Sequence, residues 1–163
     1  MFSRLETKPQ QTAIILSASI FRLSLRPSSM EEPSVTTTTP KSVLIVDDNG
    51  FVRQGLCELF KRETDFEVCG EAQNGKEAIE KAVKLRPDLI VLDLSMPVMN
   101  GFDAARALKR LMPTVPLIMY SAFGDRLAEH QARLIGISEV VSKSEQASVL
   151  IHKARGLLHS HAA

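Results

Sequence analysis

Apolar residues fall into two alternating patterns along this chain from residue 41 onward. Short apolar runs predict strands at residues 43–46, 66–69, 89–92, 115–121 and 140–141. After each run, apolar residues recur every three or four positions, which predicts helices over residues 52–60, 78–83, 102–112, 127–135 and 147–158. Strands that alternate with helices in this way predict an α/β fold, a doubly wound five-stranded parallel sheet with five helices.

Three Asn-Gly pairs stand at residues 49–50, 74–75 and 100–101. Taken alone, Asn-Gly is a signal for a hairpin turn between two strands. Here each pair precedes a helical pattern, so we predict that the three asparagines cap the N-termini of helices.

Residues 1–40 differ in composition from the rest and end in four threonines and Pro40. An apolar run at residues 13–21 among basic side chains is compatible with a targeting peptide or an amphipathic membrane-surface segment. The run is short and lacks a clear cleavage pattern. We therefore favour a disordered leader, or an upstream extension whose natural start is Met30, followed by one domain over residues 41–163.

The composition of the 163 residues, 44% hydrophobic and 24% charged, is that of a globular protein. Lys and Arg number 20 against 19 Asp and Glu, so the bulk surface gives no electrostatic reason to bind nucleic acid. No apolar stretch reaches the roughly 18 to 20 residues that span a bilayer. Cys57 and Cys69 lack metal-ligand spacing and are predicted to be buried, reduced thiols of a cytoplasmic protein.

Polar side chains follow four of the predicted strands. Asp47 and Asp48 end the first strand, Asp93 ends the third and Ser121 the fourth, while Lys143 follows the fifth. Any one of them alone is as well explained as a turn former or a surface residue. Because the carboxyl ends of parallel strands share one edge of the sheet, the set as a whole predicts a binding site there.

Clustered carboxylates repel one another unless a cation lies between them, and Mg²⁺ is the natural cation for oxygen ligands. Asp47 and Asp48 can face one ion. Asp93 is then the nucleophile that attacks a phosphoryl group and forms an acyl phosphate. Ser121 could donate a hydrogen bond to a phosphoryl oxygen, and Lys143 could neutralise its charge.

Residues 41–158 resemble the receiver domain of two-component response regulators, which has the CheY-like, flavodoxin-like fold. The matching segments are VLIVDD (43–48), EAQNGKEAIEKA (71–82), PDLIVLDLSMPVMNG (87–101), VPLIMYSAFGD (115–125) and the strand before Lys143. The third segment is the most specific of these.

This resemblance implies that Asp93 accepts a phosphoryl group from a phosphohistidine of a sensor histidine kinase. It also implies that Asp48 and Asp93 hold Mg²⁺, with Asp47 acting mainly through water and the Ser95 backbone carbonyl completing the set. Ser121 and Lys143 would bind the phosphoryl oxygens.

Two positions depart from the family pattern. Val140 stands where the family often has an aromatic residue, and Ser144 stands where it often has a proline joined by a cis bond. A cis bond before a residue other than proline costs about 2.5 to 4 kcal/mol. We therefore expect the backbone after Lys143 to differ from the family, or the strain to be carried by the site.

The leading hypothesis is a stand-alone response regulator in which phosphorylation biases residues 121–141 toward binding a downstream protein, or which relays the phosphoryl group. Only one predicted helix follows Lys143, so we expect no output domain, no catalysis beyond the protein's own phosphorylation and dephosphorylation, and no direct contact with nucleic acid or membrane. The phosphoryl group could also come from a phosphotransfer protein instead of a sensor histidine kinase. A homodimer through the last helix is a further open alternative.

Two rival functions remain. An aspartate-nucleophile phosphohydrolase needs a second acid two positions after its nucleophile, where this chain has Ser95, and a cap segment that is missing. A receiver-like interaction domain without phosphotransfer would not need the complete set of acceptor residues.

Removal of residues 1–40 is predicted to change the thermal unfolding midpoint little, because a detached terminus makes few stabilising contacts. Thermal denaturation of the full chain and of residues 41–163 compares the two directly. A large drop in the midpoint of the shortened chain would show that the leader belongs to the fold.

Overall fold

The computed structural model describes residues 39–122 and 126–159. Its strands are β1 (Lys41–Val46), β2 (Phe66–Ala72), β3 (Leu89–Leu92), β4 (Leu117–Ser121) and β5 (Glu139–Ser142). Its helices are α1 (Gly50–Lys61), α2 (Gly75–Leu85), α3 (Gly101–Leu111), α4 (Arg126–Ile135) and α5 (Ala147–His159). All ten predicted elements are present. The predicted leader lies outside the described residues except for its last two, so its nature stays a prediction.

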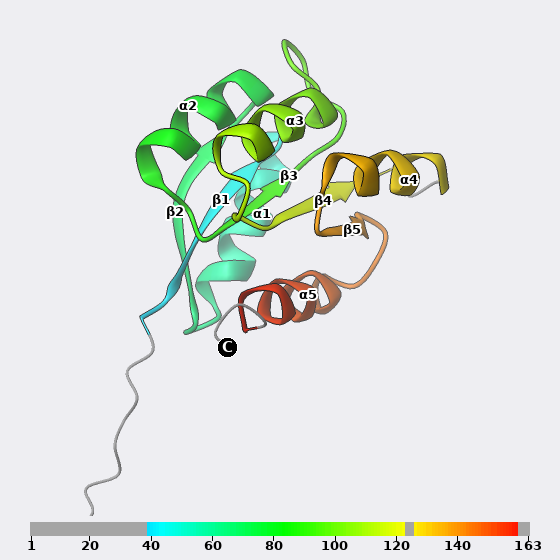
Figure 1. Ribbon diagram of the computed structural model, residues 1–163. Helices are drawn as coiled ribbons and strands as arrows, with labels where there is room; N and C mark the ends of the chain where they lie inside the picture. Colours follow the sequence, from blue (N-terminus) through cyan, green and yellow to red (C-terminus); the bar gives the residue numbers. More distant parts are fainter. Residues whose placement is uncertain (1–38, 123–125, 160–163) are drawn as a thin grey trace, which may run out of the picture. The chain divides into compact units, whose positions relative to one another are not determined.

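The five strands form one parallel sheet in the order β2-β1-β3-β4-β5. This confirms the predicted doubly wound α/β sheet (Figure 1). The strand order reverses between β1 and β3, and such a reversal opens a crevice at the carboxyl ends of the two strands. The fold therefore offers a binding crevice where β1 and β3 end.

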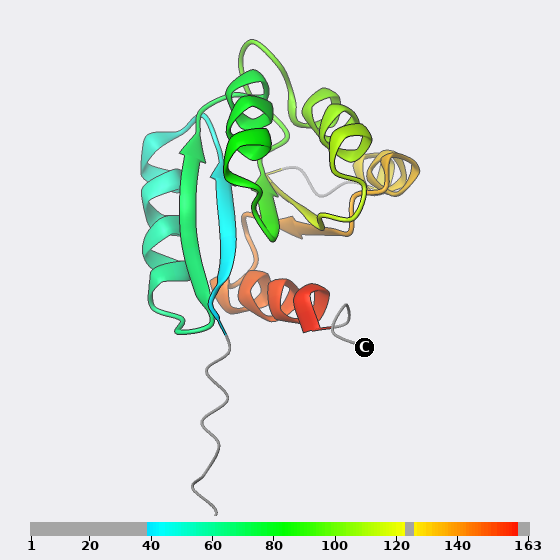
Figure 2. The ribbon, with the colours of Figure 1, turned by 60° about the vertical axis from the view of Figure 1, so that its left-hand side comes forward.

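Helices cover both faces of the sheet. One core cluster joins the sheet to α1 and α5, and the other joins it to α2, α3 and α4 (Figures 1 and 2). Strand β3 supplies both clusters: Ile90 and Leu92 pack on one side, and Leu89 and Val91 on the other. None of its four side chains is more than 1% exposed, as expected for a central strand between two helical layers.

All three predicted asparagine caps are confirmed. The Asn49 side chain accepts from the Phe51 and Val52 amides at the start of α1. Asn74 and Asn100 each accept from the amide three residues later, at 2.9 Å in both cases. These caps begin α1, α2 and α3 directly after the loops that leave β1, β2 and β3.

Several details differ from the sequence predictions. Strand β2 continues to Ala72 beyond the predicted end at Cys69, and Val83 of α2 is 46% exposed although its spacing suggested a core position. The predicted burial of Cys57 is confirmed, and it raises the pKa of that thiol to about 11, whereas Cys69, also predicted to be buried, is only half-buried on the edge strand β2. The first expectation for the backbone after Lys143 agrees with the structure: no cis peptide bond occurs in residues 39–122 or 126–159, which includes the bond between Lys143 and Ser144.

No helix within the described part of the chain combines the length and apolar character needed to cross a membrane.

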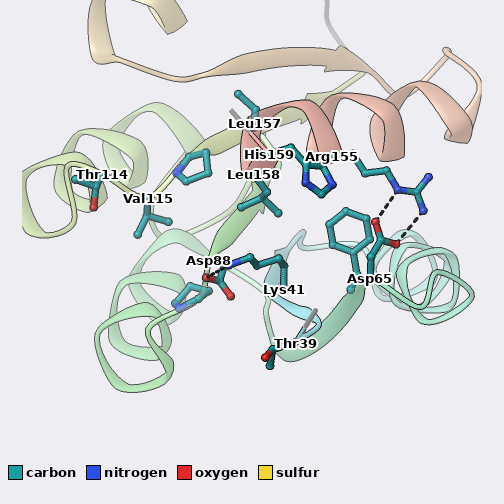
Figure 3. Close-up of a pocket in the computed structure, with 13 residues that line it drawn as sticks. Thr39, Lys41, Asp65, Asp88, Thr114, Val115, Arg155, Leu157, Leu158 and His159 are labelled. Atoms are coloured by element: carbon teal, nitrogen blue, oxygen red, sulfur yellow. Dashed lines mark hydrogen bonds and ion pairs between the residues drawn. The ribbon is translucent and has the colours of Figure 1, made fainter. Parts of the chain in front are cut away.

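Charged side chains tie the C-terminal half of α5 to the loop between α1 and β2. The Arg155 guanidinium donates to Asp65 through Nε at 2.6 Å and Nη2 at 2.9 Å (Figure 3). Nη2 also donates to Glu63. It also lies 5.8 Å from the centre of the Phe66 ring. The hydrogen bonds from Arg155 hold the pKa of the Asp65 carboxyl below its usual range.

Arg155→Met is predicted to lower the free energy of unfolding at neutral pH by about 1 kcal/mol, because the carboxylates lose a charged donor at a partly exposed site. The pKa of Asp65 is lower in the folded chain, so this contribution is complete above the unfolded value of about 3.9 and disappears as the pH falls through the folded value. Urea unfolding at neutral and acidic pH should show the difference between parent and variant shrinking below about pH 4.

Arg110→Met, which removes an exposed arginine at the end of α3, is the matched control and should leave stability nearly unchanged. An Arg155→Met effect that is equally large well below pH 4 would contradict the assignment to Asp65.

Candidate functional site

Two buried carboxylates lie at the carboxyl ends of the neighbouring strands β1 and β3. Val46 and Leu92 are partners in the parallel register, so Asp47 and Asp93 leave the sheet side by side. The Asp93 amide donates to the Val46 carbonyl at 2.8 Å, which fixes the start of its loop. The two residues are only 1% and 4% exposed. The predicted strand-end cluster is therefore formed at the crevice where the strand order reverses.

Lys143 connects these carboxylates. Its Nζ lies 2.6 Å from Asp47 Oδ2 and 3.0 Å from Asp93 Oδ1. Its backbone amide donates to the Ser121 carbonyl at 2.8 Å, which places it one residue beyond the end of β5. The Lys143 ammonium, which follows the outermost strand β5, thus reaches across the end of β4 to two acids near the centre of the sheet.

The electrostatic surroundings of Asp93 raise the pKa of its carboxyl group. Burial is the main reason that the pKa of Asp93 is raised, and the negative charge of Asp47 adds to it, while Lys143 acts in the opposite direction. For Lys143 burial lowers the pKa, but the hydrogen bonds to Asp47 and Asp93 outweigh burial and the net pKa is raised. The acids keep the lysine charged, but the one positive charge of Lys143 does not neutralise two carboxylates.

The acids also meet the requirements of a hard cation. Asp47, Asp48 and Asp93 each offer a carboxylate oxygen, and these oxygens lie within 4.8 Å of one another. Asp48 is exposed, so solvent and ions reach the cluster from its side. Oxygen donors at this spacing suit Mg²⁺, which keeps several of its own waters. The fourth predicted ligand residue, Ser95, lies exposed in the loop two residues after Asp93, and its role as a ligand stays a prediction.

Ser121 is the last residue of β4 and is 2% exposed. Its register partner is Ser142, the residue before Lys143. The hydroxyl therefore belongs to the same edge of the sheet as the acids and the lysine. All five predicted strand-end residues reach that edge.

The family model of the response regulator receiver domain matches residues 43–155 of this chain. The chain belongs to the response regulator receiver domain family. Among curated proteins, the chemotaxis protein CheY of Thermotoga maritima is 38% identical over 111 residues, which are 68% of this chain and 92% of that protein.

A protein-glutamate methylesterase/protein-glutamine glutaminase of Hahella chejuensis is 48% identical over 80 residues, 49% of this chain. The match covers only 20% of that enzyme, so the chain spans about a fifth of the length of this relative. Among solved structures, a chain of the CheX–CheY–BeF3–Mg²⁺ complex from Borrelia burgdorferi is similar with a TM-score of 0.69 and 26% identity. The similarity covers 72% of this chain and 89% of that chain.

Arg53 supports this receiver site and was not anticipated from the sequence. Its Nη1 donates to the Asp47 carbonyl at 2.7 Å, and its Nε lies 3.3 Å from Glu71 on β2. The loop that carries Asp47 and Asp48 is thereby tied both to α1 and to the neighbouring strand. The only signal in the sequence is an arginine within the first turn of the helix that follows the two acids.

A cavity of about 540 Å³ lies at the opposite end of the strands, where they begin (Figure 3). Its lining includes Lys41 and Phe66, the first residues of β1 and β2, and Asp88 just before β3. Lys41 and Asp88 pair across it at 3.6 Å. None of the predicted site residues lines this cavity, so cavity size does not locate the receiver chemistry.

Asp93→Asn is predicted to raise the free energy of unfolding by about 1 kcal/mol in buffer with a metal chelator. The variant removes the charge that burial and Asp47 disfavour, while its amide oxygen can still accept from Lys143. Urea unfolding of both proteins, with and without Mg²⁺, measures the effect. Mg²⁺ should stabilise the parent more than the variant, since a cation bound only by the folded state adds to stability.

Asp103→Asn, at an exposed acid of α3 outside the cluster, serves as the control, and Mg²⁺ should stabilise it relative to chelator as much as it stabilises the parent. A metal-free Asp93→Asn protein that is less stable than the parent would contradict this account of the site.

Proposed function

We propose that this receiver domain accepts a phosphoryl group on Asp93, in a reaction that depends on Mg²⁺. The observation that carries the proposal is the buried Asp93 carboxylate, 3.0 Å from the Lys143 ammonium and clustered with Asp47 and Asp48. The donor is a phosphohistidine on a sensor histidine kinase or phosphotransfer protein. The P–N bond of the donor breaks as a P–O bond to Asp93 forms, and the imidazole leaves with its electron pair.

Asp48 and Asp93 would hold the cation directly, with Asp47 acting mainly through water and the Ser95 carbonyl as a further ligand. The cation would supply a positive charge beside the phosphoryl oxygens as negative charge gathers on them. The two Asp47 oxygens already accept from Lys143 Nζ at 2.6 Å and from the Asn49 amide at 2.9 Å. These bonds support an orienting role for Asp47. The Mg²⁺ and BeF3 of the similar Borrelia complex also support the proposal.

Lys143 and Ser121 would bind the phosphoryl oxygens. The Lys143 ammonium needs no long movement for this, because it already lies 3.0 Å from the Asp93 carboxylate. Its raised pKa, caused by hydrogen bonds to the two acids that outweigh burial, keeps it charged at neutral pH. Ser121 is buried at the same edge, where its hydroxyl can donate to a phosphoryl oxygen.

The output would be a change in residues 121–141 that favours a downstream protein partner, or onward relay of the phosphoryl group. We infer a cytoplasmic signalling protein without a further catalytic activity, and a homodimer through α5 remains an alternative. Because the chain spans a fifth of its methylesterase relative, that enzyme's activity is not carried over to it. An exposed Ser95, where a phosphohydrolase needs a second acid, disfavours the enzyme alternative.

Incubation with acetyl phosphate and Mg²⁺ is predicted to add one phosphate per chain, visible by intact-protein mass spectrometry and removable by hydroxylamine. Asp93→Asn should abolish this label, because no carboxylate remains to form the acyl phosphate. Asp103→Asn is the control and should label like the parent. A chelator should prevent labelling.

Equal labelling of Asp93→Asn and the parent would overturn the assignment of the acceptor. Continuous release of phosphate from a generic phosphate ester would instead revive the phosphohydrolase alternative. Transfer from a histidine-phosphorylated kinase or phosphotransfer domain then tests the physiological donor class.

A further inference from the structure

The loop between β3 and α3 carries Asp93 into the following helix, and its backbone is strained. Val98 adopts a φ of 68° and is 81% exposed. Positive φ is unfavourable for a residue branched at Cβ, and no buried side chain of Val98 compensates for it. The surrounding structure must therefore hold this loop in place.

Gly101 closes the loop at its base. Its amide donates to the Leu94 carbonyl at 2.9 Å. A Cβ at this position would lie 2.2 Å from the Asp93 carbonyl oxygen and 2.8 Å from Leu94 Cα. Only glycine lets the start of α3 return this close to the backbone of Asp93.

Gly75 holds the same loop from a different helix. It is the first residue of α2, and its amide donates to the Met99 carbonyl at 3.1 Å. A Cβ on Gly75 would lie 2.9 Å from that carbonyl oxygen and 2.8 Å from both Met99 Cγ and Ala104 Cβ. The hydrogen bond that the Glu77 amide donates to the Asn74 side chain fixes the first turn of α2 and thereby holds Gly75 against the loop.

The close contact at Gly75 is not a general property of the helical glycines. Gly55, in the middle of α1, would meet nothing within 4 Å if it carried a Cβ. Gly75 is buried at a crossing between α2 and the loop, whereas Gly55 is exposed. Glycine at position 75 is therefore required by the approach of the Met99 backbone.

We propose that Gly75 is a positioning residue for the phosphoacceptor. By holding the Met99 carbonyl, it fixes the loop that begins at Asp93 and so sets the orientation of the Asp93 carboxylate and of the Ser95 backbone. This inference rests on the proposed function. Helix α2 contributes no acid or lysine to the site, but through Gly75 it would help to determine the rate of phosphorylation.

Gly75→Ala is predicted to slow labelling by acetyl phosphate at saturating Mg²⁺ by about tenfold or more, since small displacements of a reacting group have effects of this size. The amide resonances of Met99 and Gly101 should shift in the same variant, while those of the opposite sheet edge should not. Gly55→Ala is the matched control and should label at the parent rate with an unchanged spectrum around the loop.

A second pair of variants separates loop positioning from helix packing. Ala104→Gly removes the Cβ that the new methyl group would meet on α3 but leaves the Met99 carbonyl in place. The double variant Gly75→Ala/Ala104→Gly should therefore still be labelled more slowly by acetyl phosphate than the single variant Ala104→Gly. Recovery of the Ala104→Gly rate in the double variant would overturn the proposal, as would a parent rate in Gly75→Ala.

If Gly75→Ala does not fold, amide hydrogen exchange in the parent protein tests whether Gly75 holds the loop. The Gly75 and Gly101 amides should be protected to a similar degree as the Asp93 amide, which bonds to Val46 at 2.8 Å. Rapid exchange of Gly75 beside a protected Asp93 would overturn the proposal. If the parent protein itself is not labelled at Asp93, the proposed function is refuted. If the parent is labelled but the variants or the exchange rates contradict the role of Gly75, only the present proposal fails.

Discussion

Two buried carboxylates, those of Asp47 and Asp93, depend on one ammonium group, that of Lys143. Burial of a charge is costly unless the charge is paired, and here one positive charge serves two negative ones. The exposed Asp48 adds a third negative charge to the cluster. The cluster therefore has fewer positive than negative charges on its solvent-exposed side, and a divalent cation would correct this deficit.

The parallel sheet is what brings these groups together. Asp47 and Asp93 are neighbours because β1 and β3 are paired, although they are far apart in sequence. Lys143 directly follows β5, which lies two strands away from β3, and the lysine side chain is long enough to cross the end of β4. Arg53 and Gly75 then fix the two acidic loops from outside the cluster. The helices therefore contribute to the site by holding loops, while the strand ends contribute its reactive groups.

The alternation of apolar patterns was sufficient to predict the order of the elements, the three asparagine caps and the gathering of the strand-end residues. Each of these follows from local residue types and from the shared edge of a parallel sheet. The contact between Gly75 and Met99 could not be predicted, because it depends on how closely α2 approaches a loop distant in sequence. The exposure of Val83 could not be predicted either, since its spacing fits the buried stripe of α2 and only the packing of the folded helix decides.

Acids lie beside basic residues at both ends of the strands, and the cavity of Figure 3 lies at the end opposite the site. At that opposite end, hydrogen bonds favour the charged form of the acids. Arg155 lowers the pKa of Asp65, and for Asp88 the hydrogen bonds from Ser42 outweigh burial so that its pKa is also lowered. At Asp93 burial prevails and the pKa is raised. A carboxylate that the fold stabilises in its charged form contributes to stability, whereas one that the fold disfavours is poised to gain a cation or a covalent partner. This difference in charge balance distinguishes the strand ends at which we propose phosphorylation from the opposite ends of the strands.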